Sequence, residues 1–186
     1  MRIIGGEAKG KRIYLPKGCK IRPTSDMIKE SLFNSLYAVE GKSFLDLFAG
    51  CGSVGLEALS RGAARVLFIE NNLALVNAIK RNITNFHFES KAEVLGLDAD
   101  RGLRQLSRRG ERFHVLFADP PYEKGFFKKV LRIISESDLV ADDGTIIIQH
   151  SLREDSEMWP EGRCILRERK RFGDTVLSFF AVGRKE

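Results

Sequence analysis

The sequence predicts an α/β fold with a mostly parallel, seven-stranded sheet that ends in an antiparallel hairpin. Strand-like apolar runs alternate with segments of helical periodicity, as in parallel sheets that carry helices on both faces. A glycine-rich turn directly follows the apolar run at 44–48. Near the end, the strand-like segments 164–172 and 175–182 are joined by Gly173 and Asp174 alone, which favours a short hairpin.

The first 22 residues are expected to form a basic extension, and residues 23–186 the main domain. Segments 2–4 and 11–15 resemble two short strands joined by a glycine-bearing turn, which predicts a small β-hairpin. The remaining sequence has the length and apolar content of one domain with its own core, because 43% of the 186 residues are hydrophobic.

The main domain is expected to begin with a helix. Pro23 precedes it, Thr24 is a suitable N-cap, and Ile28, Leu32 and Leu36 recur at the spacing of one helical face. The next elements continue the alternation of strand and helix. Strands are expected at 44–48, 65–69, 93–97, 113–118 and 145–149, and helices at 53–61, 72–84, 101–109 and 126–134.

The net charge of +6 is unevenly distributed along the chain. Residues 1–34 contain eight Lys/Arg and three Asp/Glu, and residues 161–186 contain seven and four, so the segment between them has a charge of −2. Basic ends suggest contact with a polyanion, while the middle carries the chemistry. A generally basic, soluble surface is the alternative explanation.

Several classes of protein are disfavoured. No apolar run approaches the length of a membrane span, and the first residues lack the apolar core of a signal peptide. The three cysteines are scattered without metal-ligand spacing, and the three histidines are isolated. These features predict a cytoplasmic protein without a metal site or a disulfide framework.

The turn after the first strand is suited to binding a nucleotide-like ligand. Gly50, Gly52 and Gly55 permit a tight turn into a helix whose first N–H groups are unpaired. Glu70 ends the next strand, 20 residues after Gly50, the spacing of an acid that accepts hydrogen bonds from a ribose diol. This pattern fits NAD as well as it fits S-adenosylmethionine. Asp46 favours S-adenosylmethionine, because a carboxylate suits its cationic end and repels a pyrophosphate.

The sequence Asp119-Pro120-Pro121-Tyr122 follows the apolar run 113–118. Such a turn suits methyl transfer to the exocyclic amine of a nucleic acid base, whose lone pair is delocalised into the ring. A carboxylate and a proline carbonyl held at fixed φ can accept the two N–H hydrogens, and the tyrosine offers a stacking face for an unstacked base. We therefore assign Asp119, Pro120, Pro121 and Tyr122 as candidate catalytic residues; an ordinary strand-to-helix turn is the alternative.

Together these motifs resemble the RsmD family of bacterial methyltransferases. The resemblance covers nearly the whole chain, and it is carried by segments 2–12, 22–26, 32–34, 46–63, 119–122 and 172–175. It implies the Rossmann-like fold of S-adenosylmethionine-dependent methyltransferases and N2-methylation of a guanine in 16S RNA. The implied partner is the small ribosomal subunit or its assembly intermediate, and we expect a monomer. Met27 and Cys51 depart from the family pattern, in which a basic residue and a threonine are common.

The candidate binding residues fall into two groups. The predicted S-adenosylmethionine-binding residues are Arg22, Thr24, Asp46, Phe48, Ala49, Gly50, Gly52, Gly55, Glu70, Asn71, Asp98 and Ala99. For Arg22 and Thr24 this role is implied by the resemblance, and for Asp98 a helix cap is an equal explanation. The predicted RNA-binding residues are Arg2, Lys9, Lys11, Arg12, Lys17, Lys20, Lys170 and Arg171.

Three other functions remain open from the sequence. A DNA or tRNA amine methyltransferase would use the same motifs. A nicotinamide oxidoreductase fits the glycine turn and Glu70 but leaves Asp46 and the Pro-Pro turn unexplained. A non-catalytic ribosome-assembly protein would bind RNA without transferring a methyl group.

Overall fold

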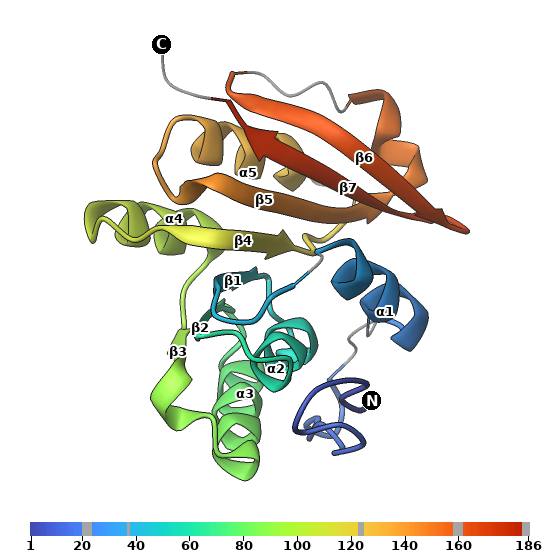
Figure 1. Ribbon diagram of the computed structural model, residues 1–186, viewed down its shortest axis with the longest axis vertical. Coiled ribbons are helices and arrows are strands. Elements are labelled where there is room, and N and C mark those ends of the chain that lie inside the picture. The colour runs from blue at the N-terminus through green and yellow to red at the C-terminus, as the bar shows by residue number, and fades with distance from the viewer. Residues whose placement is uncertain (20–23, 37, 123–124, 158–161, 184–186) are drawn as a thin grey trace. The chain divides into compact units, whose positions relative to one another are not determined.

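Strands and helices alternate along the chain in the computed structural model, which describes residues 1–19, 24–36, 38–122, 125–157 and 162–183. The seven strands form the mostly parallel sheet with a terminal antiparallel hairpin that the sequence predicts (Figure 1). The chain divides into two units, Met1–Asp98 and Ala99–Glu186, which are described in turn.

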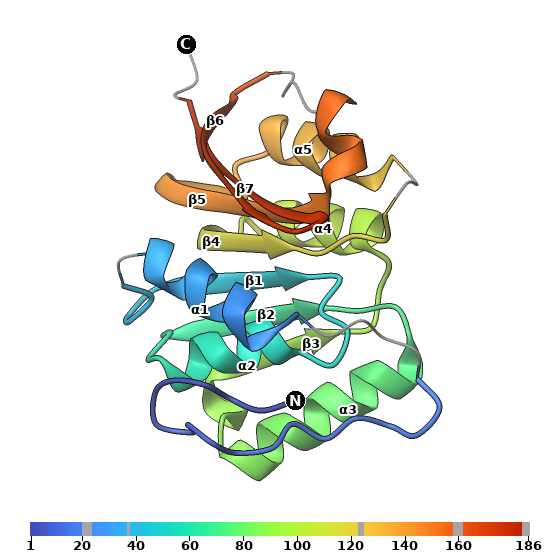
Figure 2. The same ribbon diagram turned by 90° about the vertical axis from the view of Figure 1, so that its right-hand side faces the viewer.

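The first unit is built on three parallel strands. They are β1 (Ser43–Leu47), β2 (Arg65–Ile69) and β3 (Ala92–Leu95), in the order β3-β2-β1 (Figure 2). Helices α2 (Ser53–Ser60) and α3 (Leu73–Phe86) make the crossovers that parallel strands require. Nearly every residue of β1 and β2 is buried, as expected for strands covered on both faces.

Helix α1 (Asp26–Ser35) begins one residue later than Thr24 would allow as a cap. Ser25 is the N-cap, and its hydroxyl oxygen accepts a hydrogen bond from the backbone N–H of Ile28 at 3.2 Å. The prediction of Thr24 as the cap is therefore wrong. The backbone of Ser25 is extended and places its hydroxyl below the third residue of the helix, while the side chain of Thr24 is buried.

Residues 1–19, here called the N-terminal arm, fold into a tight loop rather than the two expected strands. One isolated antiparallel bridge joins Arg2 and Arg12, with a hydrogen bond from Ile3 N to Lys11 O of 3.0 Å. The side chains of Ile3, Ala8 and Ile13 are buried. A longer ladder does not form because several backbone groups of the arm bind side chains of other elements instead.

The second unit contains strands β4 (Phe113–Ala118), β5 (Val140–Ser151), β7 (Thr175–Val182) and β6 (Cys164–Phe172), in the order β4-β5-β7-β6. β4 and β5 are parallel, whereas β7 is antiparallel to both of its neighbours. Helices α4 (Ala99–Arg108) and α5 (Phe126–Ser135) belong to this unit. The short 3₁₀ segments are Glu89–Lys91 in the first unit and Leu152–Glu157 in the second.

Strand β5 is longer than the sequence predicts. It begins at Val140 and not at the expected residue 145, since Val140 already pairs with Phe113 and Thr145 pairs with Val115, with the turn-like residues Asp142, Asp143 and Gly144 between them. The intervening residues form an irregularity in the ladder, so a turn-like sequence is absorbed as a bulge. The far end of β5 pairs with β7 as far as Ser151, so Gln149 and His150 lie within the paired part of the strand.

Candidate functional site

The glycine turn after β1 is held to the sheet by the carboxylate of Asp46. This side chain is buried, and its Oδ2 accepts a hydrogen bond from Gly55 N at 2.8 Å. A Cβ at Gly55 would lie 2.3 Å from Cε1 of Phe68, so only glycine fits where helix α2 crosses β2. The predicted anion is thus present at the end of β1, and it also fixes the first turn of α2.

Glu70 holds the same turn from the end of β2. Its Oε2 accepts from Gly50 N and its Oε1 from Asn72 N, both at 2.8 Å. Asp46, Gly50 and Glu70 are therefore brought together at the carboxyl ends of β1 and β2. Gly50 has a φ of 58°, and a Cβ there would meet no atom within 4 Å, so open space lies beside a positive-φ turn flanked by two carboxylates. These features fit a ligand that carries a cationic group and a diol.

Phe48 is a strained residue at this turn. Its φ of 60° lies in the left-handed region, which is a genuine outlier for a bulky side chain. Such strain persists where the surrounding structure over-determines it, and it clusters at functional sites. Ala49 N donates to Ile69 O at 3.0 Å, so pairing with the neighbouring strand continues past the strained residue.

One further predicted S-adenosylmethionine-binding residue belongs to this turn. Gly52 is the N-cap of α2 and has a φ of 78°. Asn71 is exposed, Asp98 is half-buried, and Ala99 begins α4. Arg22 lies outside the described residues. Their contact with the methyl donor stays a prediction.

The catalytic turn directly follows β4, as the sequence predicts. Asp119 and Tyr122 are half-buried, Pro120 is buried and Pro121 is exposed. One residue missed by the sequence analysis binds this turn. The side-chain amide of Gln149, on β5, donates from Nε2 to Oδ2 of Asp119 at 2.9 Å and to the hydroxyl of Tyr122 at 3.5 Å.

Gln149 is buried, and among the described residues its Oε1 atom has no hydrogen-bond partner. A buried acceptor without a donor costs free energy, so this glutamine is poorly explained by stability alone. It does orient the carboxylate of Asp119. The available signal was a polar residue at the end of the apolar run Ile146–Ile148, although the partner could not be read from the sequence.

His150, the next residue on β5, is buried in the core of the second unit and is hydrogen-bonded there. Its Nδ1 lies 2.9 Å from Ser151 O and its Nε2 2.8 Å from the hydroxyl of Ser178. A backbone carbonyl can only accept, so Nδ1 carries the hydrogen and Nε2 accepts from the serine. Burial is the main cause that lowers the pKa of His150 below 6.5. This histidine is therefore a neutral core residue.

The two buried cysteines are unreactive thiols. Burial raises the pKa of Cys51 and of Cys164 to about 11, so neither is a thiolate at neutral pH. Among residues 1–19, 24–36, 38–122, 125–157 and 162–183, no group of three or more metal-binding side chains could hold an ion. No helix in that part of the chain is long and apolar enough to span a membrane.

The predicted RNA-binding residues lie in both units. In the arm, Lys9, Lys11, Arg12 and Lys17 are exposed, and Arg2 pairs with Asp26 at 3.2 Å. In the terminal hairpin, Lys170 pairs with Glu168 at 3.4 Å and Arg171 donates to Gly173 O at 2.9 Å. Lys20 lies outside the described residues.

Comparison with known proteins identifies the family. The model described as Conserved hypothetical protein 95 matches residues 1–181. The chain belongs to this family. Relatives within it confirm the resemblance to RsmD, because Ribosomal RNA small subunit methyltransferase D of Escherichia coli K12 is 31% identical over 170 residues, or 91% of this chain and 84% of that protein.

Two further family relatives support the same class. The proposed rRNA methyltransferase YlbH of Bacillus subtilis is 33% identical over 181 residues, covering 97% of this chain and 98% of that protein. The structure of the proposed methyltransferase yhhF of Escherichia coli aligns with a TM-score of 0.86 at 28% identity, over 100% of this chain and 99% of that chain. The fold is that of the S-adenosylmethionine-dependent methyltransferases, so the family favours a methyltransferase over a nicotinamide oxidoreductase.

Proposed function

We propose that this protein transfers a methyl group from S-adenosylmethionine to the exocyclic N2 amine of a guanine in 16S RNA. The observation that carries the proposal is the carboxylate of Asp119, held by Gln149 at 2.9 Å in an Asp-Pro-Pro-Tyr turn, in a chain that matches rRNA methyltransferases over almost its full length. We propose further that the substrate is the small ribosomal subunit or an assembly intermediate, and that the protein acts as a monomer in the cytoplasm.

The turn after β1 suits the methyl donor. Asp46 and Glu70 offer carboxylates to a cationic group and to ribose hydroxyls, and the open space beside Gly50 leaves its backbone accessible. S-Adenosylmethionine, when bound, supplies an electrophilic methyl group on a sulfonium. Hydrogen bonds from Gly50 and Gly55 already orient both carboxylates before any ligand arrives, which lowers the cost of ordering the site.

The catalytic turn supplies orientation and electrostatic stabilisation. Asp119 and the Pro120 carbonyl accept the two N2 hydrogens of guanine, which directs the nitrogen lone pair away from the turn. Tyr122 stacks on the base after it has left its helix. As the N–CH₃ bond forms and the S–CH₃ bond breaks, positive charge develops on nitrogen, and the carboxylate of Asp119 stabilises it. The surplus proton then leaves through Asp119 to solvent.

The role of Gln149 follows from this mechanism. Its amide N–H bonds to one carboxylate oxygen of Asp119, which fixes the rotation of the carboxyl group. Gln149 is therefore a positioning residue that acts through Asp119.

The test is methyl transfer from labelled S-adenosylmethionine to unmodified small ribosomal subunits, with naked 16S RNA, tRNA and duplex DNA in parallel. We expect label in the subunit sample, and the RNA sample shows whether ribosomal proteins are needed. Asp119→Ala is expected to abolish turnover while binding of S-adenosylhomocysteine is retained. Label in tRNA or DNA but not in ribosomal RNA would overturn the substrate; donor binding lost in Asp119→Ala with normal turnover at saturation would overturn the role of Asp119.

A further inference from the structure

The N-terminal arm and helix α3 each have a net positive charge. The arm contains five Lys/Arg and one Glu, and α3 contains Lys80 and Arg81 with no acidic residue. These two segments together have a charge of +6, and the rest of the chain has 24 Lys/Arg and 24 Asp/Glu. The net charge of the whole protein thus equals the charge of the arm and α3.

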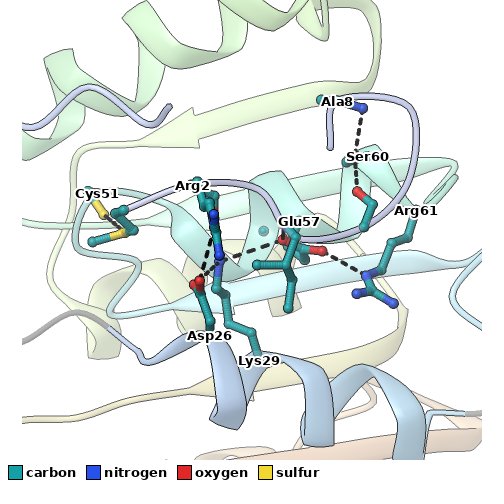
Figure 3. Close-up of polar contacts among 12 residues, drawn as sticks. Arg2, Ala8, Asp26, Lys29, Cys51, Glu57, Ser60 and Arg61 are labelled. Atoms are coloured by element: carbon teal, nitrogen blue, oxygen red, sulfur yellow. Dashed lines mark hydrogen bonds and ion pairs between the residues drawn. The ribbon is translucent and has the colours of Figure 1, made fainter. Parts of the chain in front are cut away.

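Helices α1 and α2 hold one side of the arm through the fully buried charges of Lys29 and Glu57, whose contacts are drawn in Figure 3. Glu57 accepts a hydrogen bond from Ile4 N at 2.8 Å through Oε2, and it pairs with Arg61 at 2.8 Å through Oε1. Lys29 donates to Arg2 O at 2.6 Å and lies 3.6 Å from Glu57. A buried charge is tolerated only when it is paired and hydrogen-bonded, and here the backbone of the arm completes the set.

Ser60 and Gly6 fix the arm more tightly against the end of α2. The hydroxyl of Ser60 donates to Gly5 O at 2.6 Å and accepts from Ala8 N at 2.9 Å (Figure 3). Gly6 has a φ of 73°, and a Cβ there would lie 1.8 Å from Ser60 O. No other residue fits this contact without moving the arm away from α2.

Helix α3 holds the other side of the arm, which runs beside it in Figure 2. The buried side chain of Asn82 accepts from Tyr14 N at 2.8 Å and donates to Tyr14 O at 3.0 Å. The ring of Tyr14 is 39% exposed, and the guanidinium carbon of Arg81 lies 4.0 Å from its centroid. Lys11 lies 5.6 Å from the ring centroid of Phe86. We call the buried contacts that Glu57, Lys29, Ser60 and Asn82 make with the arm the clamp. Outside these contacts, the arm and α3 present an aromatic ring and cations to the solvent.

We propose that the N-terminal arm and α3 form one preformed surface for single-stranded RNA. Lys9, Lys11 and Arg12 contact phosphates, and the Tyr14–Arg81 pair is a stacking platform for an unpaired base. This inference rests on the proposed function, in which RNA is the substrate. Bases stack on aromatic rings and on guanidinium planes alike, and clustered cations bind the backbone of any sequence. The buried clamp removes the cost of ordering the arm when RNA binds.

The platform is tested by binding of the unmodified 16S RNA, measured without methyl donor, and by KM for RNA. The double variant Tyr14→Ala/Arg81→Ala is expected to raise both Kd and KM about tenfold or more, with kcat at saturating RNA and donor affinity unchanged. Arg132→Ala removes an exposed arginine on α5 and serves as the charge-matched control. If the double variant and Arg132→Ala change RNA affinity equally, or if neither changes it, the stacking platform is overturned.

The phosphate contacts are tested by the salt dependence of the same binding. Replacing Lys9, Lys11 and Arg12 by alanine should reduce the slope of log K against log salt by about 2, because each lost contact to single-stranded nucleic acid contributes about 0.7. An unchanged slope would show that Lys9, Lys11 and Arg12 do not contact RNA phosphates, and it would overturn this part of the proposal.

The clamp is tested with two glycines of the same arm. Gly6→Ala and Gly10→Ala both place a side chain at positive φ, but only Gly6 has a backbone atom in the way; at Gly10 nothing lies within 4 Å. Gly6→Ala is expected to weaken RNA binding several-fold more than Gly10→Ala does, at unchanged donor affinity. Equal RNA affinities of these two variants would show that the position of the arm is irrelevant.

Two outcomes separate this inference from the proposed function. If the wild type binds 16S RNA through Tyr14 and Arg81 but methylates no RNA, the proposed function fails and the surface stands. If the Tyr14→Ala/Arg81→Ala variant loses affinity for assembled subunits yet binds naked RNA normally, the surface contacts a ribosomal protein, and the RNA assignment is overturned.

Discussion

Replacing Gln149 by leucine should separate activity from stability. The change removes the 2.9 Å hydrogen bond to the carboxylate of Asp119, and hydrogen bonds to charged groups contribute about 1.5–3 kcal/mol. If that energy holds Asp119 in its reactive orientation, its loss lowers kcat about 10- to 150-fold. KM for S-adenosylmethionine should not change, because Gln149 acts through Asp119, which in the proposed mechanism binds the base.

The free energy of unfolding of Gln149→Leu should be higher than that of the wild type or unchanged. Leucine has a similar volume, and it eliminates the buried Oε1 that has no partner among the described residues, an atom whose burial costs about 1–3 kcal/mol. Asp119 is half-buried, so water can solvate the oxygen that the amide leaves. If Gln149 had a purely structural role, its replacement would lower the activity and the stability of the protein together.

The assay pairs single-turnover methyl transfer at saturating donor with unfolding in urea. Gln105→Leu, the same chemical change at a half-buried position of α4, is the matched control and should leave kcat unchanged. A wild-type kcat in Gln149→Leu would refute the positioning role of Gln149. So would a fall in its unfolding free energy as large as the rise in its activation free energy.

Three further predictions concern the buried polar residues and the glycine turn. The pKa of His150 is lowered in the folded protein, so the neutral form stabilises the fold above pH 6.5 and this stability is lost as pH falls. Urea unfolding between pH 8 and 5 should show the decline, with a slope of at most about 1.4 kcal/mol per pH unit, and His150→Gln should flatten it. Glu57→Ala removes the buried one of two carboxylates that pair with Lys29, whose other partner, Asp26, is partly exposed, and should lower the free energy of unfolding by about 3–5 kcal/mol; a loss below 1 kcal/mol would show that the cluster is not a coupled unit. Gly55→Ala drives a methyl group into Phe68 and should abolish S-adenosylhomocysteine binding in calorimetry, whereas unchanged affinity would mean that the turn does not contact the donor.

The fold and the two motif-bearing turns could be predicted because their signals are local. A glycine turn after an apolar strand, and a Pro-Pro turn after another, fix backbone geometry within a few residues. The proximity of Gly50 and Glu70 could also be predicted, since parallel strands joined by one crossover helix bring their carboxyl ends together. The hydrogen bond between the two residues follows from that topology.

The supporting residues could not be predicted because their partners are distant in the sequence. Gln149 reads as the end of a buried strand, and its bond to Asp119 spans 30 residues. Asn82 reads as one more residue of an amphipathic helix, yet it clamps Tyr14 across 68 residues. The expected strands of the arm failed for the same reason: Glu57 and Ser60 of α2 take the backbone groups that a ladder would have used.

The identity of the methylated nucleoside is the most direct test of the proposed activity. Small subunits treated with the protein and labelled S-adenosylmethionine are digested to nucleosides, which are separated and identified by mass. We expect label in N2-methylguanosine, and none when Asp119→Ala replaces the wild type. Label in another nucleoside, or equal label with the variant, would contradict the assigned amine and the role of the Asp-Pro-Pro-Tyr turn.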